Sequence, residues 1–368
     1  MKILFLESFF GGSHKDFALG LKRHSRHDIT LMTLPDKSWK WRMKGAALYF
    51  LKQIDDLSKY DVIFTTDMMD LADFLSLAGK KCPPVIIYFH ENQLSYPLAP
   101  KQKKDPHLSF INIISAAVAD KVLFNSHFHL KAFIDAAEQL VDQMPDTRPR
   151  WIIDKIREKT EVVYPGCHFK KGSIKLKECD IDPPLIIWNH RWEYDKNPEF
   201  FFDVLEGLKK KNILFSLGLL GERPDSFPKV FTRAKEQFRD ELVVCGYVES
   251  KEEYRSWLGK GAIVVSCAIQ ENFGISVVEA VRHGCIPLLP DRLSYPELMP
   301  DDFLSDILYR TKKELSEKLE HMLVHYNGYL AMQKKMSMEM ERYSWEIIIK
   351  QYDDMLDKMT FKKVNNRT

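Results

Sequence analysis

The feature that most constrains the fold is a repeated alternation of short apolar runs with amphipathic stretches. In the first half, such runs occupy residues 2–7, 28–34, 61–66, 85–89, 121–125 and 161–164. After an interruption that is rich in Gly, Pro and Lys, they resume at 185–188, 213–220, 242–245, 262–267 and 285–289. Fully apolar short runs suit parallel strands that helices cover on both faces. The sequence therefore predicts two doubly wound α/β domains, with ligands at the carboxyl ends of the strands.

The interruption at residues 166–184 marks the expected boundary between these domains. We predict a first domain over residues 1–168, a linker over 169–184 and a second domain over 185–343. A length of 368 residues fits two domains of ordinary size. Residues 312–359 mix Leu, Met, Tyr and Ile with interleaved charges, and this pattern predicts helix throughout.

Charge and composition exclude several classes of protein. Lys plus Arg total 54 against 52 Asp plus Glu, a net charge of only +2, so the chain does not coat nucleic acid nonspecifically. A local basic patch for RNA stays compatible with this balance. No apolar run reaches the roughly 18 residues of a spanning helix, and Glu7 interrupts the amino-terminal run, which we interpret as a strand rather than a secretion signal. Six scattered cysteines without a C-x-x-C pair indicate reduced core thiols in a cytoplasmic protein.

The first expected strand runs into Gly11-Gly12, which Ser13 and His14 follow. Paired glycines let the backbone approach a ligand closely, and Ser13 is expected to cap the next helix. Exposed amides at such a helix start suit a phosphate or sugar oxygen. The complete G-x-G-x-x-G motif is absent, which argues against an NAD-dependent enzyme.

Two cations follow the first strand of the second half. Arg191 and Lys196 lie five residues apart in a loop that leads to a helix beginning near Pro198. Arg as a fork and Lys as a point charge can together clamp a diphosphate without a metal. The alternative is a solvated loop in which these cations pair with Glu193 and Asp195. Both interpretations stay open at this level.

The most specific segment follows the strand at 262–267. Glu271 begins a turn whose remaining residues are Asn272, Phe273 and Gly274, and a helix is expected over about 275–283. Free amides at the helix amino end would form an anion site. Glu279 lies in this helix, eight positions after Glu271, inside the apolar run VVEAV, where a solvated surface glutamate is less expected. A carboxylate at this end can hold sugar hydroxyls.

The arginine–lysine pair and the two glutamates, in this order after successive strands, resemble the retaining GT-B glycosyltransferases of family four. The segment YSWEIIIKQYDDML resembles the closing helix of that family. Narrower segments resemble the tRNA-queuosine alpha-mannosyltransferases from Met1 to about Pro300: ESFFGGSHK, WKWRMKGAALYF, YFHENQLSYP, MPDTRP and NHRWEYDKNPE. The resemblance implies a GT-B fold in which two Rossmann-like domains face a central cleft, with the helix at about 344–359 packed back on the first domain.

The resemblance also implies an activity: a retaining, metal-independent transfer of mannose from GDP-mannose to queuosine in a tRNA anticodon of the tRNA-Asp type. Arg191 and Lys196 would neutralise the diphosphate, Glu271 would bind hydroxyls of the transferred sugar, and Glu279 would hold the ribose. The other expected donor contacts are Gly11, Gly12, Asn272, Phe273 and Gly274.

His90 follows the apolar run at 85–89 and is expected to contact the donor sugar or phosphate. The alternative is a core histidine. Its position at a strand end, with Glu91-Asn92-Gln93 after it, favours the functional interpretation.

No metal is expected. No D-x-D sequence follows a strand, and His127 and His129 lack partners at the usual ligand spacings. Protein cations would take the place of the metal. Retention could use a carboxylate nucleophile, but no second carboxylate is evidently placed for it. The resemblance favours same-face attack, in which a leaving phosphate oxygen takes the proton of the acceptor.

The first domain is expected to select the acceptor, because the second half would hold the donor. Two basic loops are expected, at residues 37–42 and 101–104, and the first of them adds Trp and Arg side chains, which suit unstacked bases beside phosphates. The expected tRNA contacts are Trp39, Lys40, Trp41, Arg42, Lys101, Lys103 and Lys104, with Arg148 added on resemblance alone. The alternative is that the tryptophans anchor the core and the lysines only solubilise the chain.

Two other functions stay open. One is a family-four transferase that uses another nucleotide sugar, or that acts on a lipid, a polysaccharide or a small molecule. A membrane-acting member would show a basic amphipathic helix with an aromatic face near the amino terminus, and residues 15–26 offer only Phe17 for such a face. The other is a GT-B-like RNA-binding protein without catalysis, which would have no need of Arg191, Lys196, Glu271 and Glu279 together.

Overall fold

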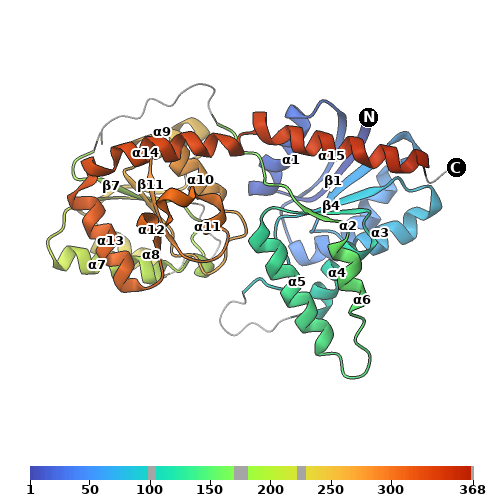
Figure 1. Cartoon of the computed structure of the whole chain (residues 1–368), viewed down its shortest axis with the longest axis horizontal. Helices are drawn as coiled ribbons and strands as arrows, with labels where there is room; N and C mark the ends of the chain where they lie inside the picture. The colour runs from blue at the N-terminus through green and yellow to red at the C-terminus, as the bar shows by residue number, and fades with distance from the viewer. Residues whose placement is uncertain (98–104, 170–180, 222–228, 366–368) are drawn as a thin grey trace. The chain divides into compact units, whose positions relative to one another are not determined.

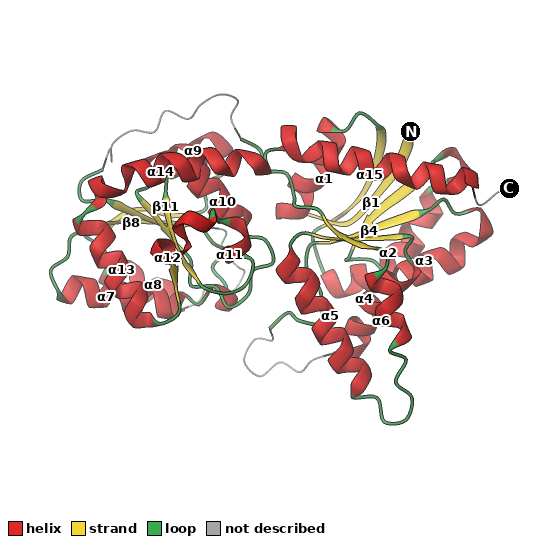
Figure 2. Cartoon of the chain, in the orientation of Figure 1, coloured by secondary structure: helices red, strands yellow, loops and turns green. Residues whose placement is uncertain are grey.

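The computed structural model describes residues 1–97, 105–169, 181–221 and 229–365 (Figure 1). The chain divides into two compact units. Unit 1 comprises Met1–His168 together with Tyr343–Thr368, and unit 2 comprises Phe169–Arg342. Each unit is built on its own six-stranded sheet, with helices packed against it (Figure 2).

The sheet of unit 1 has the order β2-β1-β3-β4-β5-β6, and its neighbouring strands are all parallel. From β1 the chain moves outward to β2 and then returns to the other side of β1, so the strand order reverses between β1 and β3. Such a reversal opens a crevice at the carboxyl ends of the strands. The strands are β1 Lys2–Phe10, β2 Asp28–Pro35, β3 Val62–Thr66, β4 Val85–Phe89, β5 Lys121–Phe124 and β6 Thr160–Val162.

Helices cover both faces of this sheet because its strands are apolar on both faces. Successive side chains of a strand point to opposite faces. Leu4 and Leu6 of β1 accordingly belong to one buried cluster, and Ile3 and Phe5 belong to another. The helices of unit 1 are α1 Gly12–His24, α2 Trp39–Gln53, α3 Leu71–Ala78, α4 Pro106–Val118, α5 His127–Asp142, α6 Trp151–Arg157 and α15 Trp345–Asn365; 3-10 turns span Leu57–Lys59 and Gly79–Lys81.

The last helix of the chain, α15, completes the core of unit 1 beside α1 (Figure 1). Trp345, Ile348 and Tyr352 are buried in the same cluster as Phe17 of α1. The indole of Trp345 packs so closely on two glycines that a Cβ at Gly20 or at Gly166 would come within 2.2 Å of it. These positions therefore require glycine.

The sheet of unit 2 has the order β12-β11-β10-β7-β8-β9, again parallel throughout. The strands are β7 Leu185–Trp188, β8 Ser216–Leu220, β9 Leu242–Gly246, β10 Ile263–Val265, β11 Ile286–Pro290 and β12 Leu308–Tyr309. The helices are α7 Pro198–Lys210, α8 Lys229–Gln237, α9 Lys251–Lys260, α10 Ile275–Arg282, α11 Tyr295–Leu298, α12 Leu304–Ile307, α13 Lys312–Val324 and α14 Leu330–Glu339. The predicted fold class, two doubly wound parallel α/β sheets, is confirmed.

Three features of the structure bear on the sequence-based expectations for the carboxyl-terminal helix, the cysteines and membrane spans. Continuous helix over residues 312–359 is wrong, because 3-10 turns at Tyr326–Tyr329 and Met340–Tyr343 separate α13, α14 and α15. Among the described cysteines, none forms a disulfide bond: Cys82, Cys167, Cys245, Cys267 and Cys285. Among the described helices, none is both long and apolar enough to span a bilayer.

Candidate active site

The strand order of unit 2 brings two loops together that are far apart in the sequence. From β7 the chain proceeds through β8 to β9 on one side, whereas β10 pairs with the other side of β7, Ile186 lying opposite Ile263. The reversal point of this sheet is therefore between β7 and β10. The loops that follow these two strands, residues 189–197 and 266–274, contain the predicted diphosphate clamp and the first predicted glutamate. Ligands of open α/β sheets bind at such a point.

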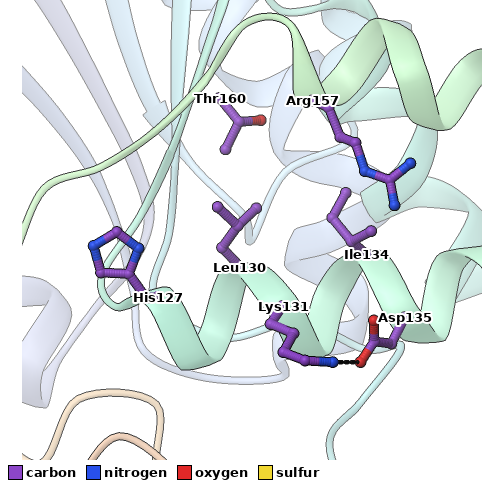
Figure 3. Close-up of a pocket in the computed structure, with 7 residues that line it drawn as sticks. All are labelled: His127, Leu130, Lys131, Ile134, Asp135, Arg157 and Thr160. Atoms are coloured by element: carbon purple, nitrogen blue, oxygen red, sulfur yellow. Dashed lines mark hydrogen bonds and ion pairs between the residues drawn. The ribbon is translucent and has the colours of Figure 1, made fainter. Parts of the chain in front are cut away.

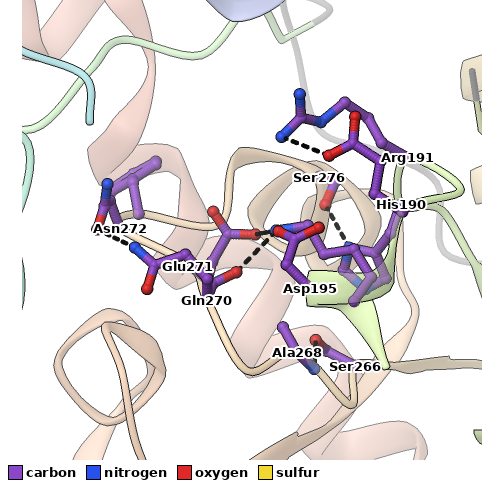
Figure 4. A network of polar contacts seen from close by, with 12 residues as sticks. His190, Arg191, Asp195, Ser266, Ala268, Gln270, Glu271, Asn272 and Ser276 are labelled. Atoms are coloured by element: carbon purple, nitrogen blue, oxygen red, sulfur yellow. Dashed lines mark hydrogen bonds and ion pairs between the residues drawn. The ribbon is translucent and has the colours of Figure 1, made fainter. Parts of the chain in front are cut away.

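Lys196 is the centre of a buried polar cluster in these loops, whose members Asp195, Gln270 and Glu271 are labelled in Figure 4. Its side chain is only 8% exposed, and its Nζ donates to the carbonyl oxygen of Gln270 at 2.8 Å and to Glu271 Oε2 at 3.2 Å. Asp195 Oδ2 lies 3.2 Å from the same nitrogen, and Asp195 is fully buried. Burial disfavours the charge, but Glu271 and Asp195 outweigh it and raise the pKa of Lys196 above its usual value. Lys196 is thus a fixed, permanently charged ammonium group.

Arg191, the other predicted cation, has a different environment. Its side chain is 52% exposed, and its Nη2 lies 3.4 Å from Glu193 Oε2. A surface ion pair of this geometry is weak and breaks easily when a stronger anion arrives. The two interpretations of the loop therefore divide between its cations. The solvated-loop interpretation fits Arg191, and it fails for Lys196, which is held by groups from two loops.

The turn before α10 is shaped by Gly274, whose φ of +96° lies in the left-handed region that glycine adopts without strain. Ser294 Oγ donates to the carbonyl oxygen of Phe273 at 2.8 Å, and Gln270 Nε2 donates to Asn272 Oδ1 at 2.9 Å. These bonds hold the turn in front of the amino end of α10. The first amides of a helix have no partner within it and favour an anion.

Glu279 lies next to a second polar group, formed by Asn189 and Tyr254, which the sequence did not indicate. Asn189 Nδ2 donates to Tyr254 Oη at 2.9 Å and to the carbonyl oxygen of Ser276 at 2.8 Å. Burial first, and then the negative charge of Glu279, raise the pKa of Tyr254 well above its usual value. Tyr254 belongs to α9, far from the loops in sequence. Only the packing of α9 against α10 brings it to this glutamate.

His190 is another residue that the sequence analysis missed. Its Nδ1 lies 3.4 Å from Ser276 Oγ, next to the Lys196 cluster (Figure 4). Burial, and then the positive charge of Lys196, lower the pKa of His190 to about 3, so its imidazole is neutral. Its place directly after β7 and before Arg191 was the available signal. Asp195 was likewise visible as the neighbour of Lys196, but only as a surface partner.

In unit 1, Gly11, Gly12 and His90 lie at the carboxyl ends of β1 and β4. The backbone N–H of His90 donates to Asp67 Oδ1 at 2.8 Å, and Asn125 Nδ2 donates to the His90 carbonyl oxygen at 2.9 Å. The predicted cap at Ser13 is wrong. Helix α1 begins at Gly12 with Gly11 as its N-cap residue and without a side-chain cap bond.

The first turn of α2 contains four of the predicted tRNA contacts, and their assignment to a loop is wrong. The backbone N–H of Trp41 donates to the carbonyl oxygen of Ser38 at 2.8 Å, so the segment is already helical. Trp39 packs against a buried cluster that includes Met43 and Met68, whereas Trp41 is 79% exposed. The core-anchor alternative therefore holds in part for Trp39 and fails for Trp41.

The structure also places three other predicted tRNA contacts, Lys40, Arg42 and Arg148. Lys40 Nζ lies 5.5 Å from the ring centroid of Trp39, and Arg42 Nε donates to the carbonyl oxygen of Pro35 at 3.2 Å. Arg148 is exposed. Lys101, Lys103 and Lys104 lie outside the described residues.

A cavity of about 400 Å³ lies elsewhere in unit 1 (Figure 3). It is lined by His127, Leu130, Lys131, Ile134 and Asp135 of α5, by Arg157 of α6 and by Thr160 of β6. Lys131 is paired with Asp135 at 2.5 Å, and Arg157 is paired with Glu138 at 2.6 Å. Because none of the predicted site residues lines this cavity, we do not place the active site there.

Within the described residues, one group of three side chains brings possible metal ligands together. Single atoms of Glu7, His14 and His90 all lie within 4.8 Å of one another. However, Glu7 Oε1 and His14 Nδ1 face each other at 3.4 Å as an ion pair. We interpret this contact as an ion pair of a protonated His14 and assign no metal to the group.

Comparisons with solved structures define the class of protein. Anabaena Alr3699/HepE in complex with UDP covers 97% of this chain and 100% of its own, with a TM-score of 0.68 at 15% identity. The match with sucrose-phosphate synthase from Thermosynechococcus elongatus covers 100% of this chain and 100% of the synthase chain, with a TM-score of 0.73 at 12% identity. The family "Glycosyl transferases group 1" matches residues 175–338. The fold is that of the GT-B glycosyltransferases, and the family match extends this class to the sequence of the second unit.

The family "tRNA-queuosine alpha-mannosyltransferase N-terminal" matches residues 2–167. The tRNA-queuosine alpha-mannosyltransferase of Drosophila melanogaster is 36% identical over 332 residues, which are 86% of this chain and 85% of the fly protein. The chain belongs to the tRNA-queuosine alpha-mannosyltransferase family.

Proposed function

We propose that this protein transfers an α-mannosyl group from GDP-mannose to queuosine in tRNA. The family to which the chain belongs supports the sugar and the acceptor. The single structural observation that carries the proposal is Lys196, a buried ammonium held by Asp195 and Glu271 at the strand reversal of unit 2. A charge fixed at this position suits a donor whose leaving group is an anion.

Cleavage of the bond between the sugar and the phosphate leaves negative charge on the diphosphate. Lys196 is held in position by three oxygen atoms, which occupy its three N–H donors, so in this proposal it exchanges one of these acceptors for an oxygen of the leaving diphosphate and stabilises that charge from a fixed position. Arg191 is exposed and weakly paired, so its guanidinium can exchange Glu193 for a phosphate oxygen. In this proposal the two protein cations and the amino end of α10 do the work that a divalent metal does in other transferases.

The proposal includes retention of configuration without a covalent sugar–enzyme intermediate. Glu271 is paired with Lys196, and Asp195 is buried against the same nitrogen, which makes both carboxylates poor nucleophiles. We therefore favour same-face attack. The C1–O bond to the phosphate breaks, a C1–O bond to a queuosine hydroxyl forms, and the hydroxyl proton passes to the departing phosphate oxygen.

For the acceptor, we propose that the first turn of α2 contacts RNA. Trp41 presents an open ring face, with Lys40 beside it in the sequence. An exposed tryptophan next to cations suits an unstacked base and its phosphates. Arg148 would extend this contact. A tRNA acceptor would place the reaction in the cytoplasm.

The test is to incubate the protein with GDP-mannose and with each of two tRNAs that differ only in carrying queuosine or guanosine at the same position. We expect nucleoside mass spectrometry to find one hexose added to queuosine alone, in a linkage that α-mannosidase removes and β-mannosidase does not. Preference for a UDP-sugar, or transfer to a lipid or polysaccharide instead, would favour the broader family-four alternative. Binding of tRNA without any transfer would favour the non-catalytic alternative.

A further inference from the structure

A buried group of ionisable side chains lies at the strand reversal of unit 1, where β1 and β3 end. Glu7 belongs to β1, His14 to the first turn of α1, and His90 follows β4. We propose that Glu7 and His14 form a positioning pair for His90. This pair holds the His90 ring at the end of β4 and places a positive charge against it. The proposal rests on the proposed function, because it requires His90 to contact the sugar donor, as the sequence predicts.

The first step is the anchoring of Glu7. This carboxylate is fully buried, which is costly unless its charge is compensated. Its Oε1 accepts the backbone N–H of Phe9 at 2.9 Å and the hydroxyl of Thr66 at 3.1 Å, and it lies 3.4 Å from His14 Nδ1. Glu7 is therefore bound to the end of β1, to β3 and to α1 at once, so its position is determined by the sheet.

The second step is the charge of His14. Burial alone would lower its pKa, but the carboxylate of Glu7 outweighs this effect, and Asp67 and Glu91 add to it, so the pKa of His14 is raised to about 9. His14 is consequently an imidazolium ion at neutral pH. Phe9 covers its ring edge at a centroid distance of 5.8 Å, which keeps water away from the pair.

The third step connects this cation to His90. The two imidazole rings lie 4.1 Å apart between centroids, tilted by 37°. Phe17 and Tyr88 meet the His90 ring edge to face at 4.9 and 4.8 Å, so three rings enclose it. Burial, then the charge of His14, then that of His129 lower the pKa of His90 far below its usual value.

The consequence is a neutral His90 beside a fixed positive charge. A neutral imidazole can accept a hydrogen bond from a sugar hydroxyl, which a protonated ring cannot. His14 adds a cation that needs no solvent reorganisation when negative charge develops nearby. The pair would thus orient the His90 ring and place a positive charge beside it, without itself contacting the donor.

The test uses Glu7→Gln, which keeps the shape of the side chain and removes its charge. The protein is labelled with 15N-histidine, and the ring signals are followed by NMR across pH. We expect His14 to titrate near pH 9 in the wild type and at a clearly lower pH in Glu7→Gln, because only the weaker effects of Asp67 and Glu91 then oppose burial. Asp353→Asn is the matched control, since Asp353 is also buried in unit 1, beside His27 at 3.8 Å.

Activity supplies the second readout. We expect Glu7→Gln to lower kcat about 10–100-fold, the range for outer partners that orient a functional histidine, with KM for GDP-mannose nearly unchanged. Asp353→Asn should leave kcat unchanged. If Glu7→Gln does not fold, His14→Gln carries the test: loss of the neighbouring cation should raise the titration midpoint of His90.

Three results would overturn the proposal. They are a neutral His14 at pH 7.5 in the wild type, an unaltered His14 titration in Glu7→Gln, and a stoichiometric metal ion bound by the wild type and lost in Glu7→Gln. The titration needs no substrate. If the wild type transfers no mannose, the proposed function therefore fails while the pair is still tested.

Discussion

Replacement of Lys196 by alanine is the most informative single perturbation of the proposed active site. The substitution removes an ammonium that lies 3.2 Å from both Asp195 Oδ2 and Glu271 Oε2. It leaves the fully buried carboxylate of Asp195 and the mostly buried carboxylate of Glu271 without this counter-charge, although the two residues come from loops far apart in sequence. Both the stability of unit 2 and the proposed chemistry therefore depend on this residue.

The expected loss of stability differs between the two cations of the clamp, Lys196 and Arg191. Breaking a buried ion pair from one side costs about 3–5 kcal/mol. For a domain of this size, that corresponds to a fall in Tm of about 6–20 °C. Arg191 is 52% exposed, and loss of its surface ion pair with Glu193 should cost at most about 1 kcal/mol. Loss of either charge should lower turnover about 10²–10³-fold, as for one donor to a developing oxyanion.

The assay combines scanning calorimetry with turnover of GDP-mannose on tRNA at a temperature where both variants are folded. Lys209→Ala is the matched control. Lys209 Nζ makes the same kinds of contact, to the Gln237 carbonyl oxygen at 3.0 Å and to Glu241 Oε1 at 2.7 Å, but from α7 and away from the strand reversal. Its turnover should equal that of the wild type.

The decisive comparison is between the two active-site variants. We expect Arg191→Ala to be stable and slow, and Lys196→Ala to be unstable and slow. Near-normal turnover in both folded variants would refute the assignment of the clamp. A Lys196→Ala variant as stable as the wild type would refute the argument from the buried pair.

Three further outcomes are expected. Exhaustive treatment with EDTA should leave activity intact, because the clamp supplies the positive charge; complete loss that only Mg²⁺ or Mn²⁺ restores would contradict this. Trp41→Ala should weaken tRNA binding by about 1–3 kcal/mol, the value of one base stacked on an aromatic ring. The control Trp151→Ala, which removes another exposed tryptophan of unit 1, should not weaken it. Equal affinities of Trp41→Ala and the wild type in a filter-binding assay would remove Trp41 from the RNA surface. Unit 1 should also lose stability as the pH rises. The pKa of His14 is raised in the folded state to about 9, so its contribution is complete below pH 6.5 and disappears toward pH 9. Calorimetry at pH 7 and pH 9 should show this loss in the wild type and much less of it in Glu7→Gln; an equal loss in both would contradict the assignment.

The sequence was a good guide to the elements and a poor guide to their ends. The apolar run at residues 85–89 is β4 without a change of boundary, because a run buried on both faces needs no information from elsewhere in the chain. The start of α2 was misplaced, since its tryptophans and cations resemble a loop composition. The cap at Ser13 was wrong because Gly11 takes that position without a side-chain bond.

The sequence by itself determined the alternation of strands and helices and the order in which the candidate residues follow the strands, because these patterns are local. Only the tertiary structure decided which of those residues meet. Pairing of β7 with β10 places Lys196 beside Glu271, and the adjacency of β1 and β3 places Glu7 against Thr66. In sequence Glu7 is no more than a break in an apolar run. The physical reason is that the burial and charge of an ionisable side chain are set by neighbours from distant segments, which the local pattern does not contain.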